Sequence, residues 1–200
     1  MKEHPILFSG AMVRAILDGR KTQTRRALSQ QPLEILTKRP PWEHTVTRQW
    51  NGCKVWFALM QRNPNRGTAF RCKYGEVGGR LWVKETFSDH GAFGSDGRII
   101  YRSDIPGGKQ PNGLHWKPSI FMPRKSSRIT MQITGVRVER LQDISRGDCM
   151  AEGCPFPNIA KATDPKRWYA ELWEAINDKG SWAKNPWVWV VEFQRLNSKG

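Results

Sequence analysis

The chain contains no apolar run long enough to cross a membrane. A transmembrane helix needs roughly 20 consecutive apolar residues, and no stretch of the 200-residue sequence approaches that length. The N-terminal residues 1–5 also lack the apolar core of a signal peptide. We therefore expect a cytoplasmic protein.

Cysteine is scarce and widely spaced. The four cysteines do not form the C-x2-C pairs of structural zinc sites, and no pair of histidines stands near them. They are Cys53, Cys72, Cys149 and Cys154. We expect reduced thiols, as is usual in the cytosol, and no metal or other cofactor.

Acidic residues are few relative to basic ones. The sequence has 33 Lys and Arg against 18 Asp and Glu, which gives a net charge of +15. A charge of this sign and size favours a polyanionic partner, and we expect RNA, single-stranded DNA or a modified nucleoside. The alternative is that the charge serves solubility alone.

The chain contains enough hydrophobic residues to form one core and to fold on its own. Hydrophobic residues make up 38% of the chain and include ten tryptophans, which suits a single domain spanning residues 1–200. The sequence leaves the oligomeric state open and favours a monomer.

Periodicity along the chain predicts more strands than helices. We expect strands near residues 6–8, 80–87, 98–102, 127–134, 136–141 and 185–196, and helices over 10–18, over 146–152 and from 165 onward. Ser9, Ser145 with Asp148, and Asp164-Pro165 are helix-start signals, and Gly19 and Gly153 are helix-stop signals. Because no βαβ unit repeats, the order predicts an α+β domain built on a curved sheet or small β-barrel, with the last strand central. The apolar stripe Trp168, Tyr169, Leu172, Trp173 and Ile176 is expected to be core.

Residues 32–75 and 103–125 lack clear periodicity and are rich in proline, glycine and turn signals. We expect them to be irregular insertions, with only residues 54–59 as a short strand, and the first to cover a substrate. Aromatic and basic residues alternate in and beside them: Trp42, Arg48, Trp50, Lys54, Trp56, Phe57, Arg62, Arg66, Arg71, Lys73, Phe87, Phe93, Trp116 and Phe121. The rings either stack nucleobases or anchor long loops to the core.

The segment Gly19-Arg20-Lys21-Thr22-Gln23-Thr24-Arg25-Arg26 carries the strongest functional signal. It packs four basic side chains and two hydroxyls into eight residues directly after a helix. A hydroxyl three residues from a lysine is a candidate nucleophile and base pair. The alternative is a phosphate-binding turn in which Lys21 stays charged and Thr24 donates to a phosphate oxygen.

These residues, together with the strand pair, the Ala151-Glu152-Gly153 helix end and the final strand Trp-Val-Val-Glu-Phe, resemble the ASCH domains of the PUA-like superfamily. The larger phage and prophage ASCH proteins are the most similar, with residues 79–83 as a middle anchor. The resemblance implies a PUA-like β-barrel flanked by helices, a cleft beside the first helix, and action on RNA or modified nucleosides. The small bacterial members that hydrolyse N4-acetylcytidine use a Lys, a Thr and a Glu that correspond here to Lys21, Thr24 and Glu152.

Deacylation of an exocyclic amide needs a nucleophile, a base and stabilisation of the tetrahedral oxyanion. Thr24 is the candidate nucleophile, and Lys21 acts as a base only if its pKa falls. Burial or neighbouring positive charge lowers that pKa, whereas a carboxylate in contact raises it. The sequence leaves open which effect dominates. It also leaves open whether Glu152 is catalytic or a solvated helix-end residue.

Four further residues are candidates for substrate or phosphate binding: Arg20, Arg25, Arg26 and Glu85. A structural ion pair is the alternative for Glu85. Hydrolysis of an N4-acylated cytosine is the leading prediction. A ribonuclease on the same scaffold and a non-enzymatic module that binds modified RNA or DNA are the alternatives.

Overall fold

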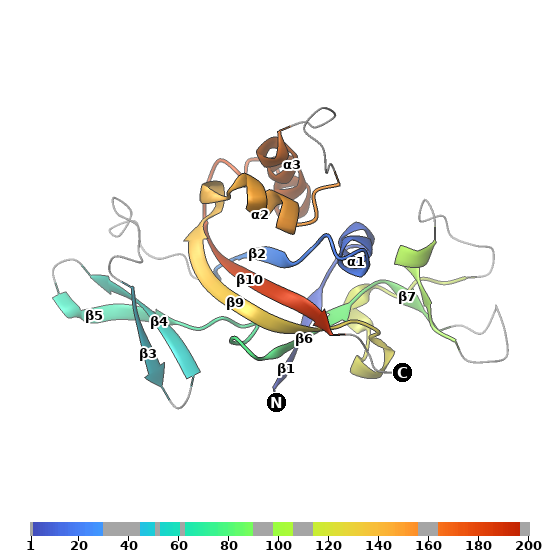
Figure 1. The fold of residues 1–200 in the computed structure, drawn as a ribbon, viewed down its shortest axis with the longest axis horizontal. Coiled ribbons are helices and arrows are strands. Elements are labelled where there is room, and N and C mark those ends of the chain that lie inside the picture. The colour runs from blue at the N-terminus through green and yellow to red at the C-terminus, as the bar shows by residue number, and fades with distance from the viewer. Residues whose placement is uncertain are drawn as a thin grey trace.

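The computed structural model describes residues 2–29, 45–50, 53–60, 63–89, 98–105, 114–155 and 164–196, with backbone alone between residues 45 and 70. Within these ranges, every helix is too short or too polar to cross a membrane. The architecture is a mixed sheet with a few helices, which confirms the α+β prediction (Figure 1).

The main sheet has five strands in the order β1-β6-β9-β10-β2. Their bounds are β1 Glu3–Leu7, β6 Arg80–Lys84, β9 Thr130–Arg140, β10 Trp187–Leu196 and β2 Gln23–Ala27. Strand β1 runs parallel to β6, and all the other pairs are antiparallel. The predicted central position of the last strand is confirmed, because β10 lies between β9 and β2.

Side chains of β10 alternate between two apolar clusters. Trp187, Trp189, Val191 and Phe193 join the larger core with β1, β6, β9 and α1 (Gly10–Leu17). Val188 and Val190 pack instead with Tyr169 and Trp173 of α3. A strand buried on both faces has no polar alternation, which is why its sequence is an almost continuous apolar run.

Helices α2 (Arg146–Ala151) and α3 (Pro165–Asn177) lie above the main sheet in the view of Figure 1, and α1 lies to the right of β2. The predicted capping box is confirmed, because the backbone N–H of Asp148 donates to the Ser145 hydroxyl and the Asp148 carboxylate accepts from the Ser145 backbone. Ser9 occupies the N-cap position of α1 without a capping hydrogen bond from its side chain.

Residues 130–140 form one strand, β9, and not the two neighbouring strands that the sequence predicts. The side chains of Met131 and Ile133 face the main core, and so do those of Val136 and Val138. The change of phase between the two sets comes from a bulge, since Glu192 pairs with Gly135 and Phe193 with Ile133. An extra residue in one strand keeps both sets on one face.

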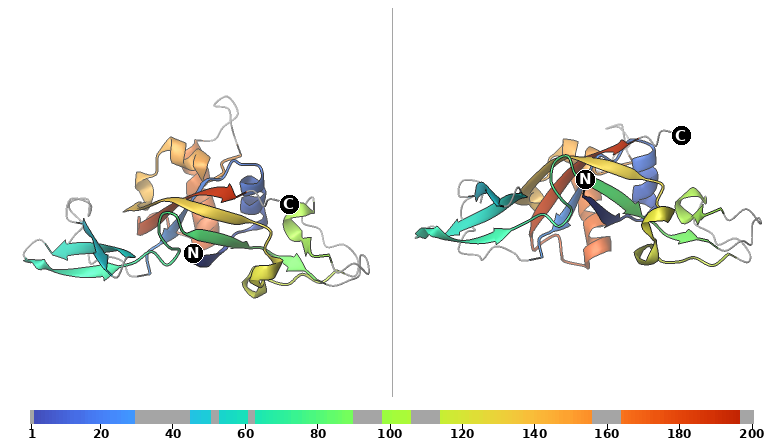
Figure 2. Two further views of the ribbon diagram at one scale, coloured as in Figure 1. Left: turned by 60° about the horizontal axis from the view of Figure 1, so that its bottom comes forward. Right: turned by 90° about the horizontal axis from the view of Figure 1, so that it is seen from below.

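The five-stranded sheet does not close into the expected barrel. Among the described residues, β1 pairs only with β6 and β2 only with β10. A side chain makes the connection that a backbone ladder would make in a closed barrel: Arg26 Nη2 donates to the carbonyl of Leu7 at 2.6 Å. The two views of Figure 2 show the open, twisted sheet.

The stretch predicted to be irregular contains a three-stranded antiparallel sheet, β3 (Thr45–Trp50), β4 (Cys53–Met60) and β5 (Asn63–Phe70). Of the three, only the middle strand was predicted from the sequence. Strand β5 contains proline, glycine and asparagine, which have low strand propensity, whereas β3 contains none of them. Both strands pair along β4. Residues 102–126 include short 3-10 turns at Arg102–Asp104, Ser119–Phe121 and Arg124–Ser126, and β7 (Phe87–Ser88) pairs with β8 (Ile100–Tyr101).

Candidate functional site

The backbone brings the Gly19–Arg26 segment against the end of α2. Lys21 and Glu152 form an isolated antiparallel bridge, and the Thr22 N–H donates to the Ala151 carbonyl at 2.8 Å. The Lys21 N–H donates to the carbonyl of Ala15, at 2.9 Å, in α1. Backbone hydrogen bonds therefore hold the Gly19–Arg26 segment against the end of α2, although the two are more than 120 residues apart in the sequence.

Lys21 and Glu152 form a buried ion pair. Lys21 Nζ lies 2.6 Å from Glu152 Oε2 and donates a second hydrogen bond, of 2.9 Å, to the Glu152 carbonyl. Only 2% of Lys21 and 3% of Glu152 is exposed. Fully buried Lys and Glu side chains are rare, because desolvating a charge is costly unless it is paired. The solvated position considered for Glu152 does not match this burial.

Burial lowers the pKa of Lys21, and this effect outweighs the contact with Glu152. Desolvation is the largest cause, the Glu152 carboxylate raises the pKa, and the charges of Arg26 and Arg25 lower it further. Of the two opposing effects that the sequence left open, desolvation is therefore the larger. The Lys21 amine loses its proton more readily than the amine of an exposed lysine.

Arg25 occupies the face of β2 opposite to Thr24 and is fully paired with carboxylates. Its guanidinium bonds to Glu139, lies 3.3 Å from Asp148 Oδ2, and approaches Glu152 Oε1 at 3.4 Å. The side chain has no solvent exposure. A phosphate can bind Arg25 only if these pairs open, so the arrangement fits a residue that holds Glu152 in place.

Asp148 connects the helix cap with this network. Its carboxylate accepts from Gln23 Nε2 at 2.9 Å and from Arg137 Nη2 at 3.0 Å. Burial alone raises its pKa, but hydrogen bonds from Ser145 and Gln23 and the charge of Arg25 keep the pKa well below its usual value. The sequence predicted no separate role for Gln23, Glu139 or Arg137. The available signals were that Gln23 lies within the Gly19–Arg26 segment and that Arg137 and Glu139 share one face of a predicted strand.

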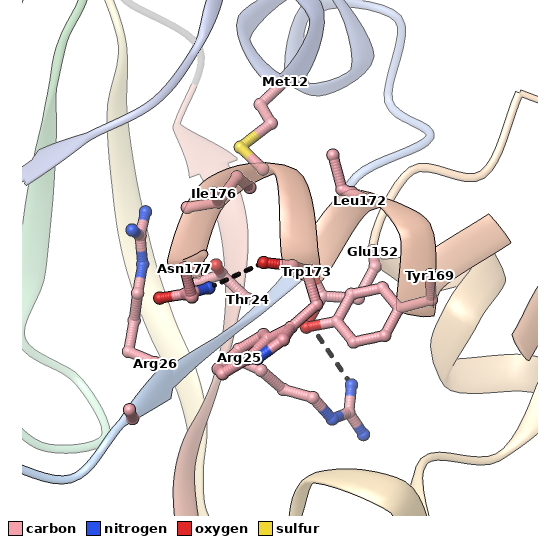
Figure 3. Close-up of a pocket in the computed structure, with 11 residues that line it drawn as sticks. Met12, Thr24, Arg25, Arg26, Glu152, Tyr169, Leu172, Trp173, Ile176 and Asn177 are labelled. Atoms are coloured by element: carbon pink, nitrogen blue, oxygen red, sulfur yellow. Dashed lines mark hydrogen bonds and ion pairs between the residues drawn. The ribbon is translucent and has the colours of Figure 1, made fainter. Parts of the chain in front are cut away.

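Thr24 and Glu152 line one small cavity, which we call the inner pocket. Its volume is about 50 Å³. It lies between β2 and α3, with Met12 of α1 at one side (Figure 3). The lining residues are Met12, Thr24, Arg25, Arg26, Ala27, Glu152, Tyr169, Leu172, Trp173, Ile176 and Asn177. Ile176 belongs to the stripe predicted as core but is 51% exposed, whereas Tyr169 and Trp173 of that stripe are buried.

A second and wider cavity, which we call the outer groove, shares three residues with the inner pocket. Its volume is about 420 Å³, and Met12, Glu152 and Leu172 line both cavities. The outer groove also has Trp168 from α3 and the charged residues Arg14, Asp18 and Arg20. Lys21 lines neither cavity. Among the hydrogen bonds of the described residues, those of Lys21 Nζ go to Glu152 and none goes to Thr24. Glu152 is thus the member of the pair that faces both cavities.

The other predicted binding residues lie at different depths. Arg20 is exposed and donates to Asp18 Oδ2 at 2.8 Å and to the Gly153 carbonyl at 3.1 Å. Arg26 lines the inner pocket and lies over the Phe8 ring, 5.4 Å from its centroid. Glu85 belongs to another buried cluster, where it bonds to Ser103 and, at 3.0 Å, to Arg128. The position of Glu85 matches the structural ion pair that was the alternative for this residue. Glu85 lines neither cavity.

Most of the aromatic and basic residues considered for base stacking lie outside the described residues, or in the part described by backbone alone. Among the described ones, Phe87 is 2% exposed and belongs to the core, whereas Phe121 is 71% exposed. Phe87 therefore anchors its loop, and Phe121 offers a free ring face.

Fold and site together define an α+β protein with a buried Lys–Glu pair between a threonine-lined pocket and a wider groove. No family model and no curated protein matches the chain. Among solved structures, it is similar to the ASCH domain from Lactobacillus crispatus JV V101, with 11% sequence identity and a TM-score of 0.40. That comparison covers 97% of this chain and 79% of the other. At this level of similarity, neither activity nor site residues carry over from the other protein.

Gly153 is expected to be essential for the position of Glu152. Its φ is +97°, and an added Cβ would lie 3.0 Å from Ala15 Cβ and 3.2 Å from Lys21 Cβ. We expect Gly153→Ala to lower the free energy of unfolding by about 2–4 kcal/mol through strain and overpacking. Gly180→Ala is the matched control, because φ there is +81° but nothing lies within 4 Å. Urea unfolding measures the free energy of unfolding of both variants. Equal decreases would show that close packing at Gly153 contributes nothing to the cost of the added methyl group.

Proposed function

We propose that this protein is ASCH-like and hydrolyses the exocyclic amide of an N4-acylated cytosine, of the N4-acetylcytidine type. The observation that carries the proposal is the buried Lys21–Glu152 pair, with 2.6 Å between Nζ and Oε2, beside a pocket that Thr24 lines. A buried acid–base pair whose lysine has a lowered pKa is suited to proton transfer.

The proposed reaction uses the hydroxyl of Thr24 and the pair as one acid–base unit. Thr24 Oγ attacks the acyl carbonyl carbon, a C–O bond forms, and the hydroxyl proton passes to the Lys21–Glu152 pair. The tetrahedral intermediate then breaks its C–N bond, and the pair returns the proton to the exocyclic nitrogen of cytosine. Water hydrolyses the acyl ester, which releases the carboxylic acid and restores the Thr24 hydroxyl. The net reaction is amide plus water to amine plus acid.

Glu152 is the residue through which the pair reaches the substrate in this scheme. It lines both cavities and holds Lys21, so a proton received at its carboxylate is shared with the amine. Arg25 approaches the other carboxylate oxygen at 3.4 Å and limits its rotation. A fixed carboxylate loses little entropy when the substrate arrives.

Binding of RNA or single-stranded DNA, with or without cleavage, is the second candidate function. It rests on the +15 net charge and on Arg14 and Arg20 at the outer groove. Contacts between such side chains and phosphates release counterions, so affinity for a polymer would fall steeply with salt.

The purified protein is expected to convert N4-acetylcytidine to cytidine and acetate, which chromatography of the nucleosides will measure. A 20-nucleotide RNA and a single-stranded DNA of the same sequence test the second function in parallel. Intact N4-acetylcytidine after long incubation would reject the amidohydrolase. Cleavage of the RNA would then favour a ribonuclease, and salt-sensitive binding without products would favour a binding module.

A further inference from the structure

The inner pocket and the outer groove differ in size in a way that matches two unequal parts of one ligand. The inner pocket, at about 50 Å³, has room for about three or four heavy atoms, given that a water molecule needs roughly 10–15 Å³ measured in this way. The outer groove, at about 420 Å³, lies within the usual range of small-molecule sites, roughly 300–1,000 Å³. Glu152 lines both, so a bond that joins the two parts of a ligand would pass beside its carboxylate.

The inner pocket combines an apolar side with a buried hydrogen-bond donor. Met12, Leu172 and Ile176 supply the apolar surface. Trp173 is only 4% exposed, and no residue of the described part of the chain accepts a hydrogen bond from its indole Nε1–H. A buried indole N–H normally has an acceptor, because a buried donor without a hydrogen bond costs free energy. The pocket is therefore suited to a short alkyl group that is attached to an acceptor oxygen.

The outer groove has the complementary features. Trp168 offers an aromatic face, and the guanidinium groups of Arg14 and Arg20 are the charged donors of its lining. Both arginines already bond to backbone carbonyls, of Ser103 and Gly153, which fixes their positions. A planar base and its sugar fit this lining better than they fit the inner pocket.

We propose that the inner pocket is an acyl pocket that limits the substrate to short acyl groups, with the Trp173 indole donating to the acyl carbonyl oxygen. The outer groove then holds the cytidine. This inference rests on the proposed amide hydrolysis and adds its acyl specificity. The Trp173 N–H stabilises the negative charge that the carbonyl oxygen gains when Thr24 Oγ adds to the carbon.

A series of N4-acyl cytidines tests the size limit. We expect kcat/KM to be highest for the formyl, acetyl or propionyl compound and to fall at least 100-fold for the benzoyl compound. Ile176→Ala enlarges the inner pocket alone, so it is expected to raise the butyryl-to-acetyl ratio at least 10-fold. Trp168→Ala, which alters the outer groove alone, is expected to raise KM by the same factor for every acyl group.

The role of the indole is tested by Trp173→Phe, which removes the N–H and keeps most of the ring. We expect kcat for N4-acetylcytidine to fall 10- to 100-fold with a melting temperature close to that of the wild type. Trp182→Phe is the control, because Trp182 packs against the same cluster and lines neither cavity.

The outcomes separate this inference from the proposed function. If no N4-acyl cytidine is hydrolysed, the proposed function fails and the acyl pocket fails with it. If all of them are hydrolysed at similar rates, and Ile176→Ala and Trp173→Phe behave like the wild type, the amidohydrolase stands and the acyl pocket is overturned.

Discussion

Thr24→Ala is expected to lower the rate of N4-acetylcytidine hydrolysis by roughly 10³-fold or more, because it removes the attacking oxygen. Affinity for the nucleoside should change little, since a hydroxyl and a methyl group contribute a small part of the contact surface. Single-turnover kinetics measures the rate, and equilibrium binding of cytidine measures the affinity.

Thr22→Ala is the matched control for this experiment. Thr22 is an exposed threonine two residues earlier, and its contacts with Ala151 and Phe193 use the backbone, which the substitution keeps. We expect wild-type rates from Thr22→Ala and partial activity from Thr24→Ser. A Thr24→Ala variant as active as the wild type would mean that water attacks the substrate directly and that Thr24 only shapes the pocket.

Lys21→Met is expected to lower the free energy of unfolding by about 3–5 kcal/mol, because it leaves the buried Glu152 carboxylate without its main partner. Lys21→Met/Glu152→Leu should recover a large part of this loss, since it removes both charges. Arg167→Met is the control for an exposed pair, because Arg167 Nε and Glu171 Oε1 lie 3.1 Å apart on α3. Loss of this ion pair should lower the free energy of unfolding by less than about 1 kcal/mol. Urea unfolding measures all three.

The lowered pKa of Lys21 also predicts how the stability difference between wild type and Lys21→Met depends on pH. Between the folded pKa and the unfolded value near 10.5, the unfolded chain binds more protons at Lys21 than the folded chain does. The contribution of Lys21 to wild-type stability therefore rises with pH across this window and is constant below it. If Glu152 instead dominated and raised the pKa, the difference would stay constant up to the unfolded value near 10.5 and would fall only above it.

Local signals in the sequence determined the ends of the helices and the character of the final strand. Ser145 and Asp148 sit at the spacing of a capping box, and Gly153 takes the positive φ that few other residues adopt. The apolar run of residues 187–191 is the pattern of a strand buried on both sides. Each of these features depends on residues within a few positions of one another, so the sequence contains the whole signal.

The tertiary structure alone decided the electrostatics of the site. The sequence predicted a role for Lys21 and Thr24 from their spacing and for Glu152 through a resemblance, but not the burial that makes desolvation outweigh the Glu152 contact. It did not reveal that Arg25 is paired with Glu139, Asp148 and Glu152. Nor did it reveal that the two strands predicted between residues 127 and 141 are one continuous strand with a bulge. These properties depend on groups far apart in the chain: Lys21 and Glu152 are separated by 131 positions. The sign of a buried residue's pKa shift is a balance between desolvation and such neighbours, and only the folded chain fixes both.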